Sequence, residues 1–239
     1  NCPAVIPMFP LPGALLLPRG QMPLNIFEPR YLAMVDDAFR TDRMIGMIQP
    51  DADGGGTPLV PKLYRVGCAG RITQFAETGD GRYLITLVGV ARFRVVEELS
   101  TPPPYRQSRV EFESFAADFT PRAGEDEVDR AGVLKALKDF VAAADARVDW
   151  KGIDQAPNEA LVNALCMMSP FGAREKQALL EAQNLKARAE VLIAITEIEL
   201  ARRGVRRSTG RVSSTRTRLH RSELAVPGSN ERMLEKAPA

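Results

Sequence analysis

The chain has 239 residues, of which 45% are hydrophobic and 26% are charged, a balance typical of one or two globular domains with a substantial core. No run approaches the ~18 consecutive apolar residues of a membrane-spanning helix, so the sequence predicts none. The three cysteines, Cys2, Cys68 and Cys166, show no C-x-x-C spacing. This argues against a disulfide framework or a zinc site and fits a reducing cytoplasm, with Cys68 and Cys166 as buried structural thiols. The first residue is Asn1 rather than Met, so the sequence leaves open whether a targeting segment precedes it.

Charge is distributed unevenly along the chain. Residues 202–239 hold ten Lys and Arg against three Glu, a net charge of +7, whereas the whole chain carries +2, which leaves −5 for residues 1–201. A segment rich in Arg, Ser, Thr and Gly cannot bury much apolar surface and is expected to be disordered. The basic segment could serve as an arm for nucleic acid or an anionic surface, or it could be a solvated extension without a role, and we favour the extension.

The first forty residues predict a β-structured entry followed by an abrupt helix start. Prolines punctuate residues 6–29, and each of them fixes φ and removes a backbone donor, so each marks a strand edge or a turn. Pro29 suits the first residue of a helix, where a missing N–H costs nothing. From there an apolar helical face is predicted, consisting of Tyr31, Leu32, Val35, Ala38 and Phe39.

The next seventy residues predict short strands. A turn at Gly79-Asp80-Gly81 favours a hairpin between its flanking apolar runs. Regularly spaced strands with one early helix suggest a small, partly closed β-barrel. The predicted strands cover residues 44–48, 64–72, 83–90, 92–96 and 105–112.

From about residue 125 the hydrophobic period becomes helical. Helices are predicted over 126–144, from Pro157 to Met168, and after Ser169-Pro170, an N-cap and first-turn pattern. Asn184 is predicted to break the chain or to cap a long amphipathic helix that follows it. Four helices of this size can pack as a bundle appended to the barrel.

The residues that carry catalysis elsewhere are scarce here. The single histidine, His220, falls in the basic segment, so Ser–His–Asp and Cys–His catalysis and histidine metal sites are not expected. Residues 53–57 are glycine-rich but lack the lysine of a phosphate-binding loop. Asp36 and Asp37 are expected on a helix surface, and Glu125 to Glu127 at a helix start. A Ser–Lys dyad has no fixed spacing, but no serine stands in a nucleophile pattern. The sequence therefore predicts a binding module with no catalytic, cofactor-binding or metal-ligating residues.

Read in order, the first forty residues resemble the N-terminal substrate-binding domain of Lon-type proteases. Residues 45–48, 64–72 and 89–93 are similar to successive strands of that family, and the resemblance covers roughly residues 4–203. It implies an α+β chain: a PUA-like, partly closed β-barrel with one early helix over 1–118, then a C-terminal helical bundle over 119–203. Residues 204–239 depart from the family pattern and are the predicted disordered tail.

The resemblance also implies a function. Lon-type proteases carry this domain ahead of an ATPase module and a Ser–Lys peptidase module, and 239 residues have room for neither. The chain thus resembles a stand-alone bacterial, cytoplasmic member of the family. The family implies recognition of polypeptide, either unfolded or tagged substrates or an ATP-dependent protease partner, and it does not imply proteolysis. The alternative is an RNA-binding protein that uses the PUA-like fold and the Arg-rich tail, but the acidic remainder of the chain argues against it. No membrane partner is expected.

Three residues at the start of the early helix are the candidate polypeptide-binding site: Glu28, Arg30 and Tyr31. They combine charge with an aromatic ring beside a barrel rim. A purely structural role, in which Glu28 and Arg30 cap or pair and Tyr31 anchors the helix, is the favoured alternative. Exposed apolar residues at 15–17, or an open barrel edge, could equally bind an extended peptide by strand addition.

Overall fold

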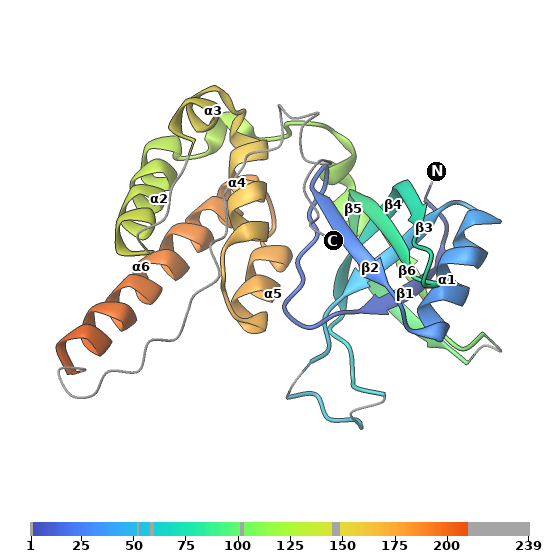
Figure 1. Cartoon of the computed structure of the whole chain (residues 1–239). Coiled ribbons are helices and arrows are strands. Elements are labelled where there is room, and N and C mark those ends of the chain that lie inside the picture. The colour runs from blue at the N-terminus through green and yellow to red at the C-terminus, as the bar shows by residue number, and fades with distance from the viewer. Residues whose placement is uncertain (1, 52, 58–59, 101–102, 145–148, 210–239) are drawn as a thin grey trace. The chain divides into compact units, whose positions relative to one another are not determined.

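The computed structural model describes residues 2–51, 53–57, 60–100, 103–144 and 149–209, with Ala144 and residues 204–209 described as backbone only (Figure 1). The described chain forms two compact units. The first contains the residues up to 123 and, after an excursion, residues 169–183. The second contains residues 124–168 and the residues from 184 onward. The chain therefore passes between the two units three times, and residues 169–183, which the sequence analysis grouped with the helices, belong to the unit that holds the strands.

The strands of the first unit form one six-stranded sheet in the order β2-β5-β4-β3-β1-β6, with an additional pairing of β5 with β6. Because β6 also pairs with β1, the ring closes through five strands, and β2 is attached outside it to β5 alone. β1 and β3 are parallel, and the other pairs are antiparallel. The predicted α+β class with a partly closed barrel is confirmed. The strands are β1 (Val5–Pro10), β2 (Gln21–Ile26), β3 (Met44–Ile48), β4 (Val66–Glu77), β5 (Tyr83–Leu99) and β6 (Gln107–Glu111).

One long strand, β5, replaces the two that the sequence predicted between residues 83 and 96. Its first half pairs with β2 and its second half with β6, while β4 follows most of its length. Register shifts in the pairings of β5 with β4 and with β6 let the strand bend without ending. The hairpin that joins β4 to β5 is confirmed: Thr78 N–H donates to the Arg82 carbonyl at 2.9 Å, and Gly81 takes a φ of +80° that suits glycine.

The loop between β1 and β2 crosses β5 at Gly89. A Cβ at this position would lie 2.0 Å from the Leu17 carbonyl oxygen, so a side chain does not fit there. This close crossing buries Leu15, Leu16 and Leu17. The expectation that these leucines are exposed for peptide binding is wrong, because the loop lies against the barrel.

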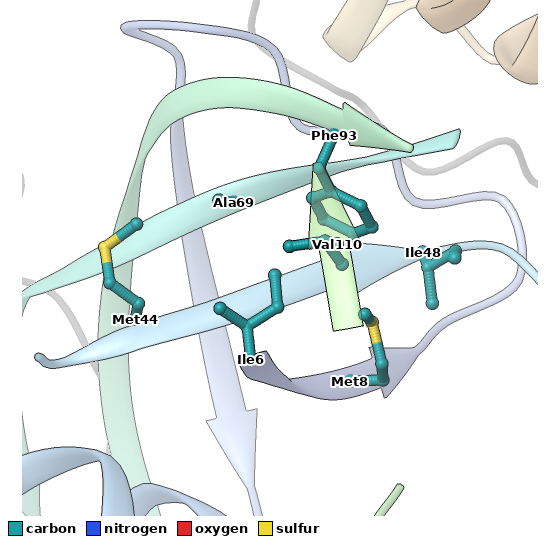
Figure 2. Close-up of a cluster of buried hydrophobic side chains, with 7 residues drawn as sticks. All are labelled: Ile6, Met8, Met44, Ile48, Ala69, Phe93 and Val110. Atoms are coloured by element: carbon teal, nitrogen blue, oxygen red, sulfur yellow. The ribbon is translucent and has the colours of Figure 1, made fainter. Parts of the chain in front are cut away.

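The centre of the barrel is a cluster of buried side chains from β1, β3, β4, β5 and β6 (Figure 2). It consists of Ile6, Met8, Met44, Ile48, Ala69, Phe93 and Val110. Gly67 and Gly46 lie so close to the Phe93 ring that an added Cβ would contact it, at 2.4 Å and 3.2 Å. The small residues of β3 and β4 thus make room for the aromatic ring at the core.

The helix predicted at Pro29 is α1 (Pro29–Phe39), with proline in its first turn as expected. Its buried residues are Tyr31, Met34, Val35 and Ala38. Phe39 is only half-buried and packs its ring on Phe75 of β4, with 4.9 Å between ring centroids. The buried face is therefore rotated slightly from the predicted one.

Two short helices complete the first unit, η1 (Glu113–Phe119) and α5 (Ala173–Glu181). α5 begins after Gly172 rather than at the predicted Ser169-Pro170 start. Buried Phe171 lies between the proline and the helix, and the first α5 backbone bond runs from Lys176 N–H to the Gly172 carbonyl. The proline therefore precedes an anchoring aromatic residue instead of opening the helix.

The second unit is helical. It consists of η2 (Glu125–Glu127), α2 (Arg130–Ala144), α3 (Trp150–Gln155), α4 (Asn158–Met168) and α6 (Leu185–Thr209). α2 and α4 both pack against α6. Asn184 is confirmed as a cap, since its side-chain oxygen accepts from Ala187 N–H at 2.8 Å. α3 was not predicted; it is capped by Asp149, which accepts from the backbone of Lys151 and Gly152.

α6 continues six residues beyond the predicted start of the tail at 204. Arg206 and Arg207 are good helix formers, so the helix can continue into the basic segment despite Gly204. The remainder of the predicted tail, residues 210–239, lies outside the described residues. None of the helices in the described part of the chain is long and apolar enough to cross a membrane.

Candidate functional site

A groove of about 460 Å³ opens in the first unit beside the N-terminal turn of α1. Such a volume lies within the range of ordinary ligand sites. Five chain segments that are distant in sequence form it: the end of β1 and the residues after it, the end of β2, the start of α1, the loop between β3 and β4, and the residues before β6. The lining residues are Met8 to Pro12, Leu24 to Glu28, Arg30, Tyr31, Pro50, Val60, Pro61 and Pro104 to Arg106.

The structure brings all three sequence-predicted residues, Glu28, Arg30 and Tyr31, to this groove. Arg30 Nε donates to Glu28 Oε2 at 2.9 Å, and its guanidinium lies 4.6 Å from the centre of the Tyr31 ring. Glu28 occupies the N-cap position, but its side chain makes no capping hydrogen bond. The pair instead forms a half-exposed charged edge on the groove.

Tyr31 also has the structural role that the sequence left open. Its ring is buried and meets Phe9 of β1 edge-on, with 4.4 Å between centroids. Burial raises the pKa of its hydroxyl, so this phenol is neutral at physiological pH. One side chain thus anchors α1 to β1 and lines the groove, and the two roles are compatible.

The groove is balanced in charge. Arg106, its second arginine, donates from Nη2 to Glu98 at 2.6 Å and from Nη1 to the Pro61 carbonyl at 2.7 Å. Arg30 is matched by Glu28 in the same way. Both guanidinium groups therefore have a carboxylate partner, and the groove favours a ligand without net charge over a strongly ionic one.

The remaining walls are apolar and rich in proline. Five prolines line the groove, and none of them can offer a backbone donor to a ligand. Phe27 and Val60 stand on the rim with 61% and 59% of their surfaces exposed. Large apolar side chains left open beside a hollow indicate a contact surface for an apolar partner. The lining prolines are Pro10, Pro12, Pro50, Pro61 and Pro104.

The barrel also has an open edge, the alternative site for an extended peptide. Among the described strands, β2 has one paired neighbour only, β5, so its other edge is free. Pro23 lies in the middle of β2, opposite Thr86 of β5. Proline in a strand is placed with its missing N–H toward the solvent edge, which weakens that edge as a template for another strand. The groove is therefore the stronger candidate for the site.

Two tyrosine–aspartate hydrogen bonds hold α1 beside the groove, and sequence reasoning missed both. Tyr105 donates its hydroxyl to Asp37 at 2.8 Å, and Tyr83 donates to Asp36 at 3.1 Å. Burial together with the Asp37 carboxylate raises the pKa of Tyr105 to about 12. The adjacent aspartates were expected to lie on the helix surface, and they do. Each also accepts a hydrogen bond from a tyrosine outside the helix, Asp36 from β5 and Asp37 from the residues before β6. Two neighbouring acidic residues on one helix were the only sequence signal of these bonds.

Of the three cysteines, only Cys2 is partly exposed. Cys68 and Cys166 are buried, as predicted, and burial raises the pKa of Cys166 to about 12. Among the described residues, no group of three or more His, Cys, Asp or Glu side chains is placed to hold a metal ion.

Comparison with known proteins places the chain in context. Residues 5–197 match the ATP-dependent protease La (LON) substrate-binding domain. Lon protease 2 of Myxococcus xanthus is 29% identical over 204 residues, which is 82% of this chain and 24% of that protein. Lon protease of Syntrophus aciditrophicus is 33% identical over 115 residues, or 46% of this chain and 14% of that protein. The chain thus spans about a quarter or less of the length of these relatives.

Solved structures agree. The Lon N-terminal domain protein from Xanthomonas campestris has a TM-score of 0.58 at 25% identity, covering 80% of this chain and 97% of that one. The N-terminal domain of the Mycobacterium avium complex Lon protease has a TM-score of 0.59 at 19% identity, covering 81% and 98%, which supports the shared fold. With the family match covering most of the barrel and the helices, the chain belongs to the Lon substrate-binding domain family.

Proposed function

We propose that this chain is a non-catalytic module that binds extended polypeptide, and that the groove beside α1 is its binding site. The observation that carries the proposal is the groove itself: an apolar, proline-walled hollow with balanced charge and an exposed aromatic residue, Phe27, on its rim. The match to a substrate-binding domain supports the same reading. Glu28, Arg30 and Tyr31 are proposed as contact residues at one wall.

The groove suits an uncharged, apolar stretch of chain. Its two arginines are already paired, so an acidic ligand would have to displace Glu28 or Glu98 to gain their charge. Apolar side chains, in contrast, gain about 25 cal/mol for each Å² removed from water. Folded proteins keep most such stretches inside, whereas unfolded chains expose them. An unfolded polypeptide is therefore the partner that this surface fits best.

The direct test is binding of an unfolded protein to the full chain. Reduced, carboxymethylated α-lactalbumin carrying fluorescein is titrated with the chain and followed by fluorescence anisotropy, with native α-lactalbumin as the folded control. We expect saturable binding of the unfolded form only. Absence of saturable binding to the unfolded form would contradict the proposal.

The groove is tested by a matched pair of aromatic truncations. Phe27→Ala should weaken binding about tenfold, because an exposed ring that becomes buried against a ligand is worth ~1–2 kcal/mol. Phe119→Ala is the control, since Phe119 of η1 is 49% exposed and does not line the groove. Equal effects of the two changes would move the binding site away from the groove.

The charge balance is tested by Glu28→Gln, which leaves the Arg30 guanidinium without its carboxylate. The carboxymethylated probe is acidic, so its affinity should rise in this variant and become more sensitive to salt, since an uncompensated surface charge is screened by ions. An ATP-dependent protease as partner is the further outcome to look for: a purified Lon-type protease, added to the complex of the chain with the probe, would then bind the chain and displace the probe.

A further inference from the structure

A buried glutamine, Gln49, connects a wall of the groove with helix α5. Gln49 follows β3 and is 1% exposed. Its Oε1 accepts from the backbone N–H of Gly13 at 3.0 Å. Its Nε2 donates to the Ala173 carbonyl at 3.0 Å and to Gln177 Oε1 at 3.1 Å. One side chain therefore joins the loop after β1 to both the start and the middle of α5.

The partners fix the orientation of this amide. Gly13 N–H can only donate, and the Ala173 carbonyl can only accept, so the oxygen of Gln49 must face the loop and its nitrogen must face the helix. Both side-chain donors are used, and the backbone carbonyl of Gln49 accepts from Tyr64 N–H at 3.0 Å. A buried amide this fully bonded is held in a single position, because each lost bond would leave a buried polar group unpaired.

The loop that Gln49 holds is part of the groove. Leu11 and Pro12 line it directly, and Leu11 N–H donates to the Ile48 carbonyl at 3.0 Å. Pro50, the residue after Gln49, lines it as well. Anything that presses on Leu11 or Pro12 therefore acts on the segment that Gln49 joins to α5.

α5 is held at several points and lies between two crossings of the chain. Gln177 Nε2 also donates to the Val66 carbonyl of β4, and Arg174 pairs with Asp53 at 2.6 Å. Residues 169–183 belong to the first unit, which holds the strands and is called the barrel unit below. Residues 124–168 and those after 183 belong to the second, helical unit. α5 is thus the part of the barrel unit to which the helical unit is covalently joined on both sides.

We propose that Gln49 transmits occupancy of the groove to α5, so that a polypeptide bound beside α1 stiffens the segment flanked by two of the three chain crossings. This inference rests on the proposed function of the groove. A ligand against Leu11 and Pro12 restrains the loop, the Gly13–Gln49 bond then opens less often, and α5 loses a route by which it detaches from the barrel. Gln49 is a positioning residue in this scheme, since it touches no ligand.

The test is amide hydrogen exchange of the full chain, free and saturated with reduced, carboxymethylated α-lactalbumin. The exchange of α5 amides should slow by about tenfold on binding, because a ligand that favours the closed state reduces the open population by mass action. In Gln49→Met, which keeps the size of the side chain and removes its hydrogen bonds, the exchange of α5 should no longer respond to the probe. Amides of α2 provide an internal reference.

Two further variants separate this effect from a loss of folding. Gln177→Met removes the bond of Gln49 to the middle of α5 but leaves the Gly13–Gln49 bond. The affinity for the probe should therefore stay within about twofold, well below a tenfold change of ~1.4 kcal/mol. The slowing of α5 amide exchange by the probe should decrease. Gln74→Met, at an exposed glutamine of β4, should change neither quantity. Unchanged α5 exchange in the wild-type chain at saturating probe would overturn the inference and leave the groove proposal standing. Failure of the probe to bind at all would remove both.

Discussion

An arginine binds the end of a short helix in each unit, and the two arginines do so in different ways. In the barrel unit, Arg92 of β5 donates from Nη1 to the carbonyls of Leu180 and Ala182 at the end of α5. In the helical unit, Arg130 of α2 donates to the carbonyls of Ile153, Asp154 and Ala156 at the end of α3. Both satisfy carbonyl groups that the last turn of a helix leaves without partners.

The surroundings of the two arginines differ. Arg92 is 2% exposed, and its Nε and Nη2 both donate to the Asp118 carboxylate at 2.8 Å. Its guanidinium also lies over the ring of Phe115 in η1. Arg130 is half-buried, and its side-chain partner is the neutral amide of Asn158. Arg92 also spans 88 residues of sequence to Leu180, whereas Arg130 spans 23 to Ile153. The barrel unit is held by a buried charge pair together with bonds from Arg92 to a helix 88 residues away, whereas the bonds of Arg130 join nearer segments and can partly be replaced by water.

Arg92→Met gives the largest expected effect. It leaves the Asp118 carboxylate buried without its partner, and breaking a buried pair from one side costs about 3–5 kcal/mol. The free energy of unfolding from urea denaturation, followed by circular dichroism, is the measurement. Asp118→Asn should lose less, because a neutral amide can still accept from Arg92. A loss below 1 kcal/mol for Arg92→Met would mean that the pair contributes no more than an exposed one.

Arg130→Met should cost less, about 1–2 kcal/mol, because the carbonyls that it leaves are near solvent and can turn to water. The loss should also be local: α3 amides should exchange faster, and those of the barrel should not. Lys135→Met is a control on the same helix, since it removes only an exposed pair with Asp139 and should change the free energy of unfolding least. If Arg130→Met destabilised the chain as much as Arg92→Met, the contrast between the two units would fail.

Tyr105→Phe tests the tether between α1 and the residues before β6. Losing the bond to Asp37 should cost about 1 kcal/mol at neutral pH. The folded chain raises the pKa of Tyr105 to about 12, from about 10 in the unfolded chain, so it favours the protonated phenol. That stabilisation is complete below pH 10 and is lost as pH rises toward 12, because only the unfolded state then readily releases the proton. The wild-type chain should therefore lose stability across this window more steeply than Tyr105→Phe, with Tyr83→Phe as the comparison variant.

Local signals explain what the sequence could predict. Pro29 marked the start of α1, the Gly79-Asp80-Gly81 turn marked the β4–β5 hairpin, and Asn184 marked the start of α6. Each depends on a few neighbouring residues, so its chemistry is complete within the pattern. The helical period likewise placed α2, α4 and α6. The candidate residues beside α1 were found in the same way, from the charges and the ring at a helix start.

Features built from distant residues escaped sequence reasoning. Gln49 meets Gln177 across 128 residues, and Arg92 meets Asp118 across 26, in both cases from within an apolar run where a polar residue carries no sign of its partner. The three leucines at 15–17 were misjudged because their burial depends on Gly89, which lets the loop cross β5. Most of the groove likewise comes from prolines that only the closed barrel brings together.

The smallest expected effect separates both units from the C-terminal segment. By sequence, residues 1–123 with 169–183 hold 15 basic and 15 acidic side chains, and residues 124–168 with 184–209 hold 11 and 12, so both units are close to neutral. Residues 210–239 hold six basic and three acidic side chains. A chain ending at Thr209 should therefore bind the unfolded probe with unchanged affinity, since it keeps all the described residues that line the groove. The RNA-binding alternative predicts instead that a single-stranded RNA oligonucleotide binds the full chain and that the deletion weakens this binding. The affinity for RNA should also fall steeply with salt, because each phosphate contact releases counterions. RNA binding that survives the deletion would place the contact in one of the two nearly neutral units. It would contradict the expectation that only the basic C-terminal segment can attract RNA.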